Sequence, residues 1–191
     1  MMRSVKLALA CLLLAAGTAT AQPAKPASQP DQSKGTEVTI DGLKSVAPPA
    51  WKPEKPANRL RSRQFKIPKA AGDKEDAEVY ILPEVGGKVE ESFNGLKELF
   101  ILPPDMPKSQ AVKESKFVVG KATIYVLELQ GTFRVKHIPI DQAVKEVKPD
   151  YRMLAVIWKS DQTSCSIRMV GPRKTVEAHT KEFENWLKNF K

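Results

Sequence analysis

Residues that bind metals or form disulfides are scarce in this chain. Its 191 residues include only two cysteines and two histidines. Cys11 falls in the apolar leader described below, so Cys165 is the one cysteine of the remaining chain, and we expect no intramolecular disulfide. Neither His137 nor His179 has a second histidine or cysteine at ligand spacing, whereas a zinc site takes about three or four protein ligands. We therefore predict no metal site.

Sequence motifs for catalysis are missing as well. The chain has no GxSxG nucleophile elbow, and no glycine-rich phosphate loop follows an expected strand. Carboxylates such as Glu90 and Glu91 are adjacent on an expected helix and point in different directions, which is typical of solvated charges. We predict no catalytic residue and no cofactor. The alternative is a hydrolase whose site forms only in three dimensions, around His137 with Asp141 or Asp150.

The chain also lacks an apolar run long enough to cross a membrane. The longest, Leu7 to Ala16, has about ten residues, roughly half of the ~20 that a spanning helix needs. Two cationic residues precede it, and Ala19 and Ala21 supply a small-x-small cleavage site. We predict that residues 1–21 are a signal peptide and that the protein is secreted or periplasmic, with no transmembrane segment in the mature chain. Acylation at Cys11 is the alternative, although the residues before it make a poor lipobox.

Acidic and aromatic residues are both in short supply. The formal net charge is +9, and the leader contributes two of these charges. Such an excess favours acidic partners, for instance an anionic envelope polymer or an acidic protein. Aromatic residues make up only 7% of the chain, and most fall at expected core positions, whereas nucleic-acid binding needs exposed aromatics among basic residues or a recognised module. We expect no nucleic-acid partner.

What is present is one domain behind a spacer. Residues 22–35 hold three prolines and no aromatic or large aliphatic residue, so they predict a disordered spacer rich in Pro, Ala and Gln. Residues 36–191 have the length of a single domain. Prolines between Pro48 and Pro56 predict an irregular loop that Trp51 packs onto the body.

Alternating and helical patterns divide this domain into strands and two helices. Apolar residues on both faces of Met153 to Trp158 predict a central strand that is covered on two sides. Steps of three and four residues predict one helix between Gly87 and Pro103 and another from Pro172 to the C-terminus. The fold class is then α+β, a mostly antiparallel sheet flanked by helices. The expected strands are 36–46, 58–67, 77–82, 112–119, 122–133, 151–158 and 164–170.

Two segments carry a resemblance to known proteins. They are RMLAVIW at 152–158 and SIRMVGPRKTVEAHTKEFENWLKNF at 166–190, which are similar to the C-terminal half of a family of uncharacterised secreted bacterial proteins. The order of strands and helices over residues 36–191 resembles the PsbP-like α/β/α sandwich of extrinsic photosystem II subunits. This resemblance implies a binding or assembly module and brings no functional residue with it.

One local pattern departs from the background of the sequence. Arg59, Arg61 and Arg63 alternate, which on one strand would place three guanidinium groups in a row at intervals of about 6.6 to 7 Å. Such a row could bind carboxylates or phosphates. It could equally cover the apolar surface next to Phe65 and pair with neighbouring acids.

Arg152 and Arg168, on the last two expected strands, either join this basic surface or lie on another. These five arginines are the candidate ligand-binding residues of the sequence. The leading hypothesis is an exported, non-catalytic module that binds a protein or an anionic envelope component. The alternative is the hydrolase described above.

Overall fold

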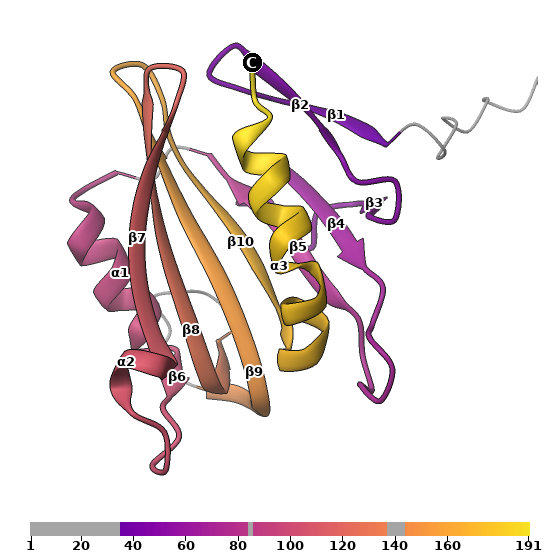
Figure 1. The fold of residues 1–191 in the computed structure, drawn as a ribbon, viewed down its shortest axis with the longest axis vertical. Coiled ribbons are helices and arrows are strands. Elements are labelled where there is room, and N and C mark those ends of the chain that lie inside the picture. Colours follow the sequence, from indigo (N-terminus) through magenta and orange to yellow (C-terminus); the bar gives the residue numbers. More distant parts are fainter. Residues whose placement is uncertain (1–34, 84–85, 137–143) are drawn as a thin grey trace, which may run out of the picture. The chain divides into compact units, whose positions relative to one another are not determined.

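An eight-stranded antiparallel sheet forms the body of the protein (Figure 1). The computed structural model describes residues 35–83, 86–136 and 144–191, so the predicted signal peptide and nearly all of the spacer lie outside the described residues. The strand order is β3-β4-β5-β10-β9-β8, and β7 and β6 share the outer edge of β8. The strands of this sheet are β3 Lys52–Glu54, β4 Arg63–Ile67, β5 Ala77–Leu82, β6 Phe100–Ile101, β7 Val112–Val119, β8 Ala122–Lys136, β9 Val144–Lys159 and β10 Ser164–Pro172.

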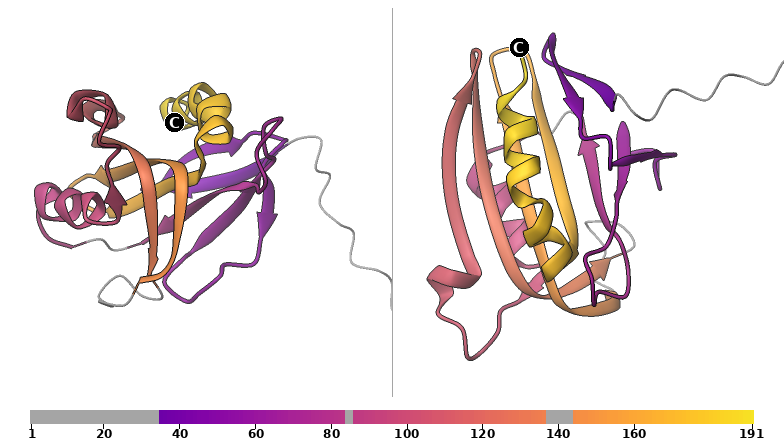
Figure 2. Two further views of the ribbon diagram at one scale, coloured as in Figure 1. Left: turned by 90° about the horizontal axis from the view of Figure 1, so that it is seen from below. Right: turned by 45° about the vertical axis from the view of Figure 1, so that its right-hand side comes forward.

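The two long helices pack on opposite faces of this sheet. Helix α3 (Arg173–Lys188) covers one face and α1 (Val89–Lys97) covers part of the other, as both panels of Figure 2 show. A short helix, α2 (Lys108–Ala111), leads into β7. The predicted α+β class, with a mostly antiparallel sheet flanked by helices, is confirmed.

Strand β9 is the central strand that the sequence predicted. It pairs with β8 and β10, and every side chain from Met153 to Trp158 is buried. Leu154, Val156 and Trp158 belong to the core under α3, while Met153, Ala155 and Ile157 belong to the core under α1. One strand therefore joins the two hydrophobic layers.

Helix α3 buries the predicted stripe. Val176, Phe183 and Leu187 are buried against the sheet. Trp51 is only 2% exposed and contacts Trp186 with ring centroids 5.3 Å apart, which confirms that it packs its loop onto the body. The loop itself was predicted to lack regular structure, and this is wrong for Lys52–Glu54, because β3 pairs there with β4 at the sheet edge.

The first predicted strand, 36–46, is a hairpin. Strands β1 (Thr36–Ile40) and β2 (Leu43–Ala47) are antiparallel and joined by Asp41 and Gly42, which have φ angles of 55° and 76°. Positive φ at both turn residues is the geometry of a type I′ two-residue hairpin, which an Asp-Gly pair favours. The Asp-Gly pair explains why the prediction of one continuous strand was wrong.

The first predicted helix is shorter than its apolar pattern. Helix α1 ends at Lys97, and Phe100 is buried from β6 instead of from the helix. Cys165 is buried in β10 as expected, and burial, with a smaller effect of Asp41, raises the pKa of its thiol to about 12. Among the described residues, no helix combines the length and hydropathy that crossing a membrane would take.

Candidate functional site

The arginine row predicted at residues 59, 61 and 63 is not formed by one strand. Strand β4 begins only at Arg63, since Asn58 closes a turn before it: the Leu60 amide donates to Asn58 Oδ1 and the Arg61 amide donates to the Asn58 carbonyl. Arg59 lies in this turn, and both Arg59 and Arg63 are exposed. The expected strand 58–67 is therefore too long at its N-terminal end.

Arg61 stabilises the sheet. Its guanidinium lies 3.7 Å from the Tyr80 ring centroid and donates to both carboxylate oxygens of Glu78, at 2.8 and 3.1 Å. A third bond, of 2.8 Å, reaches Gln64 Oε1. Arg61 is thus on the face of Tyr80, opposite to Phe65, and its side chain is only 14% exposed. The structural role considered for the row applies to this residue.

Arg168 joins Arg61 beside the same ring. Its guanidinium carbon is 6.0 Å from the Tyr80 ring centroid, and its Nε donates to Ser166 Oγ at 3.2 Å. Among the described residues, no carboxylate pairs with Arg168. The structure therefore brings together two of the five predicted arginines.

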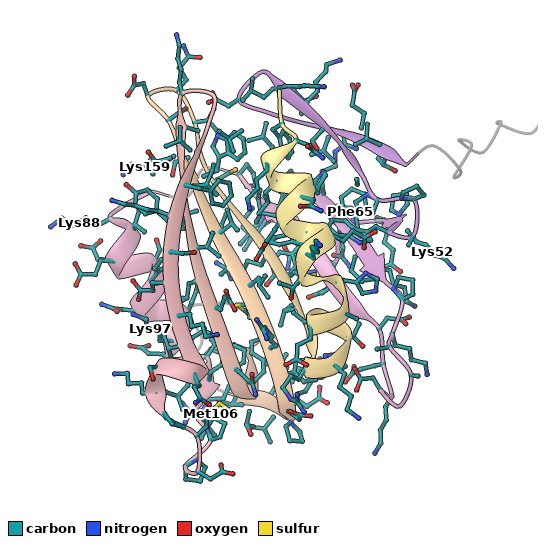
Figure 3. All side chains as sticks on the ribbon, in the orientation of Figure 1. Lys52, Phe65, Lys88, Lys97, Met106 and Lys159 are labelled. Carbon is teal, nitrogen blue, oxygen red and sulfur yellow. The ribbon has the colours of Figure 1, made fainter. Side chains whose placement is uncertain are left out.

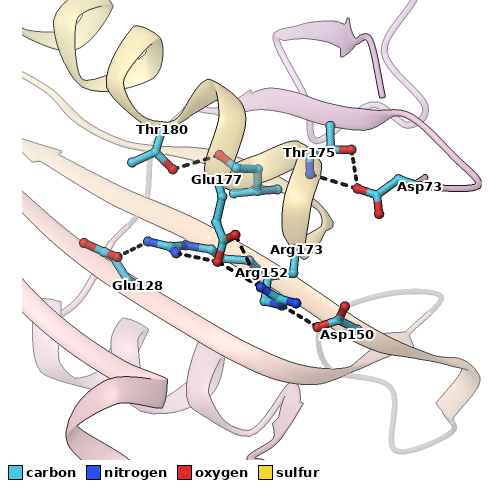
Figure 4. Close-up of polar contacts among 9 residues, drawn as sticks. Asp73, Glu128, Asp150, Arg152, Arg173, Thr175, Glu177 and Thr180 are labelled. Atoms are coloured by element: carbon cyan, nitrogen blue, oxygen red, sulfur yellow. Dashed lines mark hydrogen bonds and ion pairs between the residues drawn. The ribbon is translucent and has the colours of Figure 1, made fainter. Parts of the chain in front are cut away.

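Arg152 lies on the opposite face, in an ion network at the start of α3 (Figure 4). Its Nη2 is 2.6 Å from Glu128 and its Nη1 is 3.4 Å from Glu177. Arg173 continues the network with contacts of 3.3 Å to Glu177 and 2.6 Å to Asp150. The hydrogen bond that Arg173 Nε donates to Asp150 Oδ1 is the main cause that raises the pKa of Arg173. This network joins β8, β9 and α3, so its charges are engaged in contacts within the fold.

The residues of the alternative hydrolase do not assemble in the described part of the chain. His137 and Asp141 lie outside the described residues, and Asp150 is held by Arg173. His179 Nδ1 lies 2.8 Å from Glu182 Oε2, and its Nε2 lies 3.2 Å from the Pro68 carbonyl. Within residues 35–83, 86–136 and 144–191, no three His, Cys, Asp or Glu side chains are grouped so that they could hold a metal ion.

A pocket of about 500 Å³ is lined by β5, β8 and β9 on the face of Tyr151. Lys148 Nζ lies 2.6 Å from Glu75 Oε2 at its wall, and Lys66 pairs with Asp76 at 3.2 Å. Hydrogen bonds donated by Lys148 and Tyr151 lower the pKa of Glu75. Burial and the hydrogen bond to Glu75 raise the pKa of Tyr151. Ion pairs within the fold therefore occupy these four charged groups of the pocket wall.

A groove of about 580 Å³ lies between α1 and β7, and fewer of its lining residues form ion pairs with one another. Val89, Phe93 and Tyr125 provide its apolar floor, and Asn94 lines it from the exposed side of α1. One ion pair crosses it, from Lys97 at the end of α1 to Glu114 of β7, at 2.6 Å. Lys97 and Lys88, at the two ends of α1, are marked in Figure 3. The remaining lining residues are Glu90, Ser115 and Lys116.

Strand β7 bounds this groove and forms an open edge of the sheet. It pairs with β8 on one side, and among the described residues no strand pairs with its other side (Figure 1). Its residues 113–116 are exposed, and Val118 is 69% exposed. An open edge beside a partly apolar groove is the geometry into which extended peptides dock as an added strand.

Analysis of the sequence missed this surface. The run Lys113-Glu114-Ser115-Lys116 inside an expected strand was the available signal, because four polar residues in succession are typical of an edge strand. Neither a protein-family model nor a curated protein matches this chain.

Proposed function

We propose that this chain is an exported, non-catalytic binding module with a PsbP-like α/β/α sandwich, and that it docks an extended segment of a protein partner along β7. The single observation that carries the proposal is the groove between α1 and β7, which lies beside an open strand edge. Export is proposed from the signal-peptide pattern, and the PsbP-like character from the resemblance described above.

The chemistry of the groove suits a peptide. The backbone N–H and C=O groups on the open side of β7 supply a ladder of hydrogen bonds, which bind any extended chain. Specificity then comes from alternate side chains, which would enter the groove over Val89, Phe93 and Tyr125. Lys116 and the Lys97–Glu114 pair at the rim would select for charge at neighbouring positions.

A random peptide library displayed on phage tests the proposal, with the mature chain from Gln22 as bait. We expect enriched peptides to bind the unaltered protein and to bind Asn94→Arg about tenfold more weakly, because the new side chain fills the groove. Gln162→Arg is the matched control, since it makes the same change of charge in the exposed β9–β10 turn. Equal binding to both variants, or no enriched peptide, would contradict the proposal.

An anionic envelope component is a second candidate ligand. It is favoured by Arg59, Arg63 and Arg168, none of which has a carboxylate partner among the described residues. Polyglutamate binding that weakens from low to physiological salt, and weakens further in Arg168→Gln, is the expected result. Arg61→Gln is unsuitable for this test because Arg61 also holds Glu78 and Gln64.

A further inference from the structure

We infer that the β7 edge docks a second copy of this chain, so that two sheets join into one through antiparallel pairing of β7 with β7. This inference rests on the proposed function, because it names the occupant of the same edge. The evidence comes from aligning the sequence of β7 antiparallel with the β7 of a second copy and comparing the residues that lie opposite each other.

Two requirements restrict the possible pairings. A twofold axis perpendicular to the sheet keeps each face of β7 beside the same face of its partner, so the pairing must centre on a residue. Residues opposite each other in an antiparallel pair have Cβ atoms about 4.5–5.5 Å apart, and like charges there are destabilising. Pairings centred on Glu114 or Lys116 place two glutamates or two lysines opposite each other.

Centring on Ser115 removes this conflict. Glu114, which also pairs with Lys97 of its own chain, then lies opposite the second copy's Lys116, and the symmetric contact repeats this opposition of charges. Val112 lies opposite Val118, which covers the most exposed of the large hydrophobic side chains in the described residues. Lys113 lies opposite Phe117 on the other face. Each protomer therefore offers the same surface to the other, as an isologous interface requires.

The faces of the two protomers also match. Glu114 pairs across β8 with Leu127, and Lys116 pairs with Tyr125, so both charges lie on the α1 side of the sheet. Phe117 pairs with Ile124 and packs on the α3 side. Because the residues of each matched pair lie on the same face, the two α1 helices lie on the same side of the joined sheet.

Analytical ultracentrifugation of the mature chain from Gln22, over a range of concentrations and salt, tests the inference. We expect a dimer whose dissociation constant rises with salt. Lys116→Glu and Glu114→Lys should each raise the dissociation constant at least about tenfold, because each sets like charges opposite each other twice. The double variant Glu114→Lys with Lys116→Glu restores both ion pairs between the copies, while it loses the Lys97 pair within each chain, and should restore most of the dimer. Lys113→Glu, which keeps these two pairs, is the matched control.

Disulfide trapping checks the register independently. Ser115→Cys places a thiol directly opposite the same thiol of the second copy, so mild oxidation should give a covalent dimer. Val118→Cys, which faces Val112, should not. Cys165 is buried and does not compete.

A monomer at every concentration, with no covalent dimer from Ser115→Cys, would overturn the inference. If library peptides still bound and Asn94→Arg still weakened them, the proposed function would stand and the occupant would be another protein. A dimer that survived both single charge reversals would overturn the register and with it the inference.

Discussion

Arg152 shows how the sheet uses a charged residue to bind its own elements together. Its guanidinium bridges Glu128 on β8 and Glu177 on α3, and its side chain is only 18% exposed. A charge in such a position is costly without its partners, so the acids around it are part of its stability. The same applies to Arg61, which is held between Glu78, Gln64 and Tyr80. Both guanidinium groups are therefore engaged in contacts within the fold.

Arg152→Met should lower the free energy of unfolding by about 2 kcal/mol, because it leaves Glu128 partly buried without its partner. Urea unfolding measures this. Arg152→Met combined with Glu128→Leu should recover most of the loss, whereas Arg59→Met, at an exposed turn, should change stability by less than about 0.5 kcal/mol. If Arg152→Met left the free energy of unfolding unchanged, the network would contribute little to stability.

At the scale of elements, β8 changes neighbours along its length. Its first half pairs with β7 and its second half with β6, and the pairing with β9 is irregular between Gly131 and Phe133. Gly131 has a φ of 151°, and a Cβ there would meet the Ile101 carbonyl of β6. Glycine is therefore required where β6 approaches.

Gly131→Ala should destabilise the protein by about 1–3 kcal/mol, since it combines an unfavourable φ with a clash against backbone. Gly95→Ala is the matched control. Gly95 lies in α1 with open space around it, and alanine there should stabilise by about 0.5–1 kcal/mol. Thermal unfolding of both variants measures the difference. Unfolding midpoints that shift in the same direction in both variants would be inconsistent with this account.

The contact between Glu75 and β9 predicts a dependence of stability on pH. Lys148, then Tyr151, lower the pKa of Glu75 from its ordinary value of 4.5, so the contact stabilises the fold above about pH 4.5. This stabilisation is lost as the pH falls through the lowered pKa of the folded state. Glu75→Gln should therefore be less stable than the unaltered protein at pH 7, and the two urea midpoints should converge below pH 4.5. A constant difference across this range would refute the assignment.

Local patterns were sufficient to predict β7 and β5, whose bounds agree with their alternating residues. They were insufficient for the start of β9, because its first half carries charges and Pro149, next to Asp150 with its φ of 54°. The polar run 113–116 indicated the open edge, but the groove beside it could not be predicted. The groove exists because α1 lies beside β7. The pairing of β7 with β8 brings these two elements together, and no sequence motif marks this contact.

At the scale of the whole molecule, the sheet separates two hydrophobic layers that share their strands. Trp51, Trp158 and Trp186 all lie in the layer under α3, and the layer under α1 has no tryptophan among its described residues. Strand β9 supplies alternate side chains to both layers. If the layers unfold together, tryptophan fluorescence must report damage to the layer that contains no tryptophan.

Phe93→Ala tests this coupling from the α1 side. Phe93 is 4% exposed in the layer under α1, and its loss should cost about 3–5 kcal/mol. We expect the urea midpoint measured by tryptophan fluorescence to fall as far as the midpoint measured by far-ultraviolet circular dichroism, because β9 cannot lose one face and keep the other. A fluorescence midpoint that stays fixed while the dichroism midpoint falls would mean that α1 detaches alone, and the groove beside β7 would then open without unfolding the body.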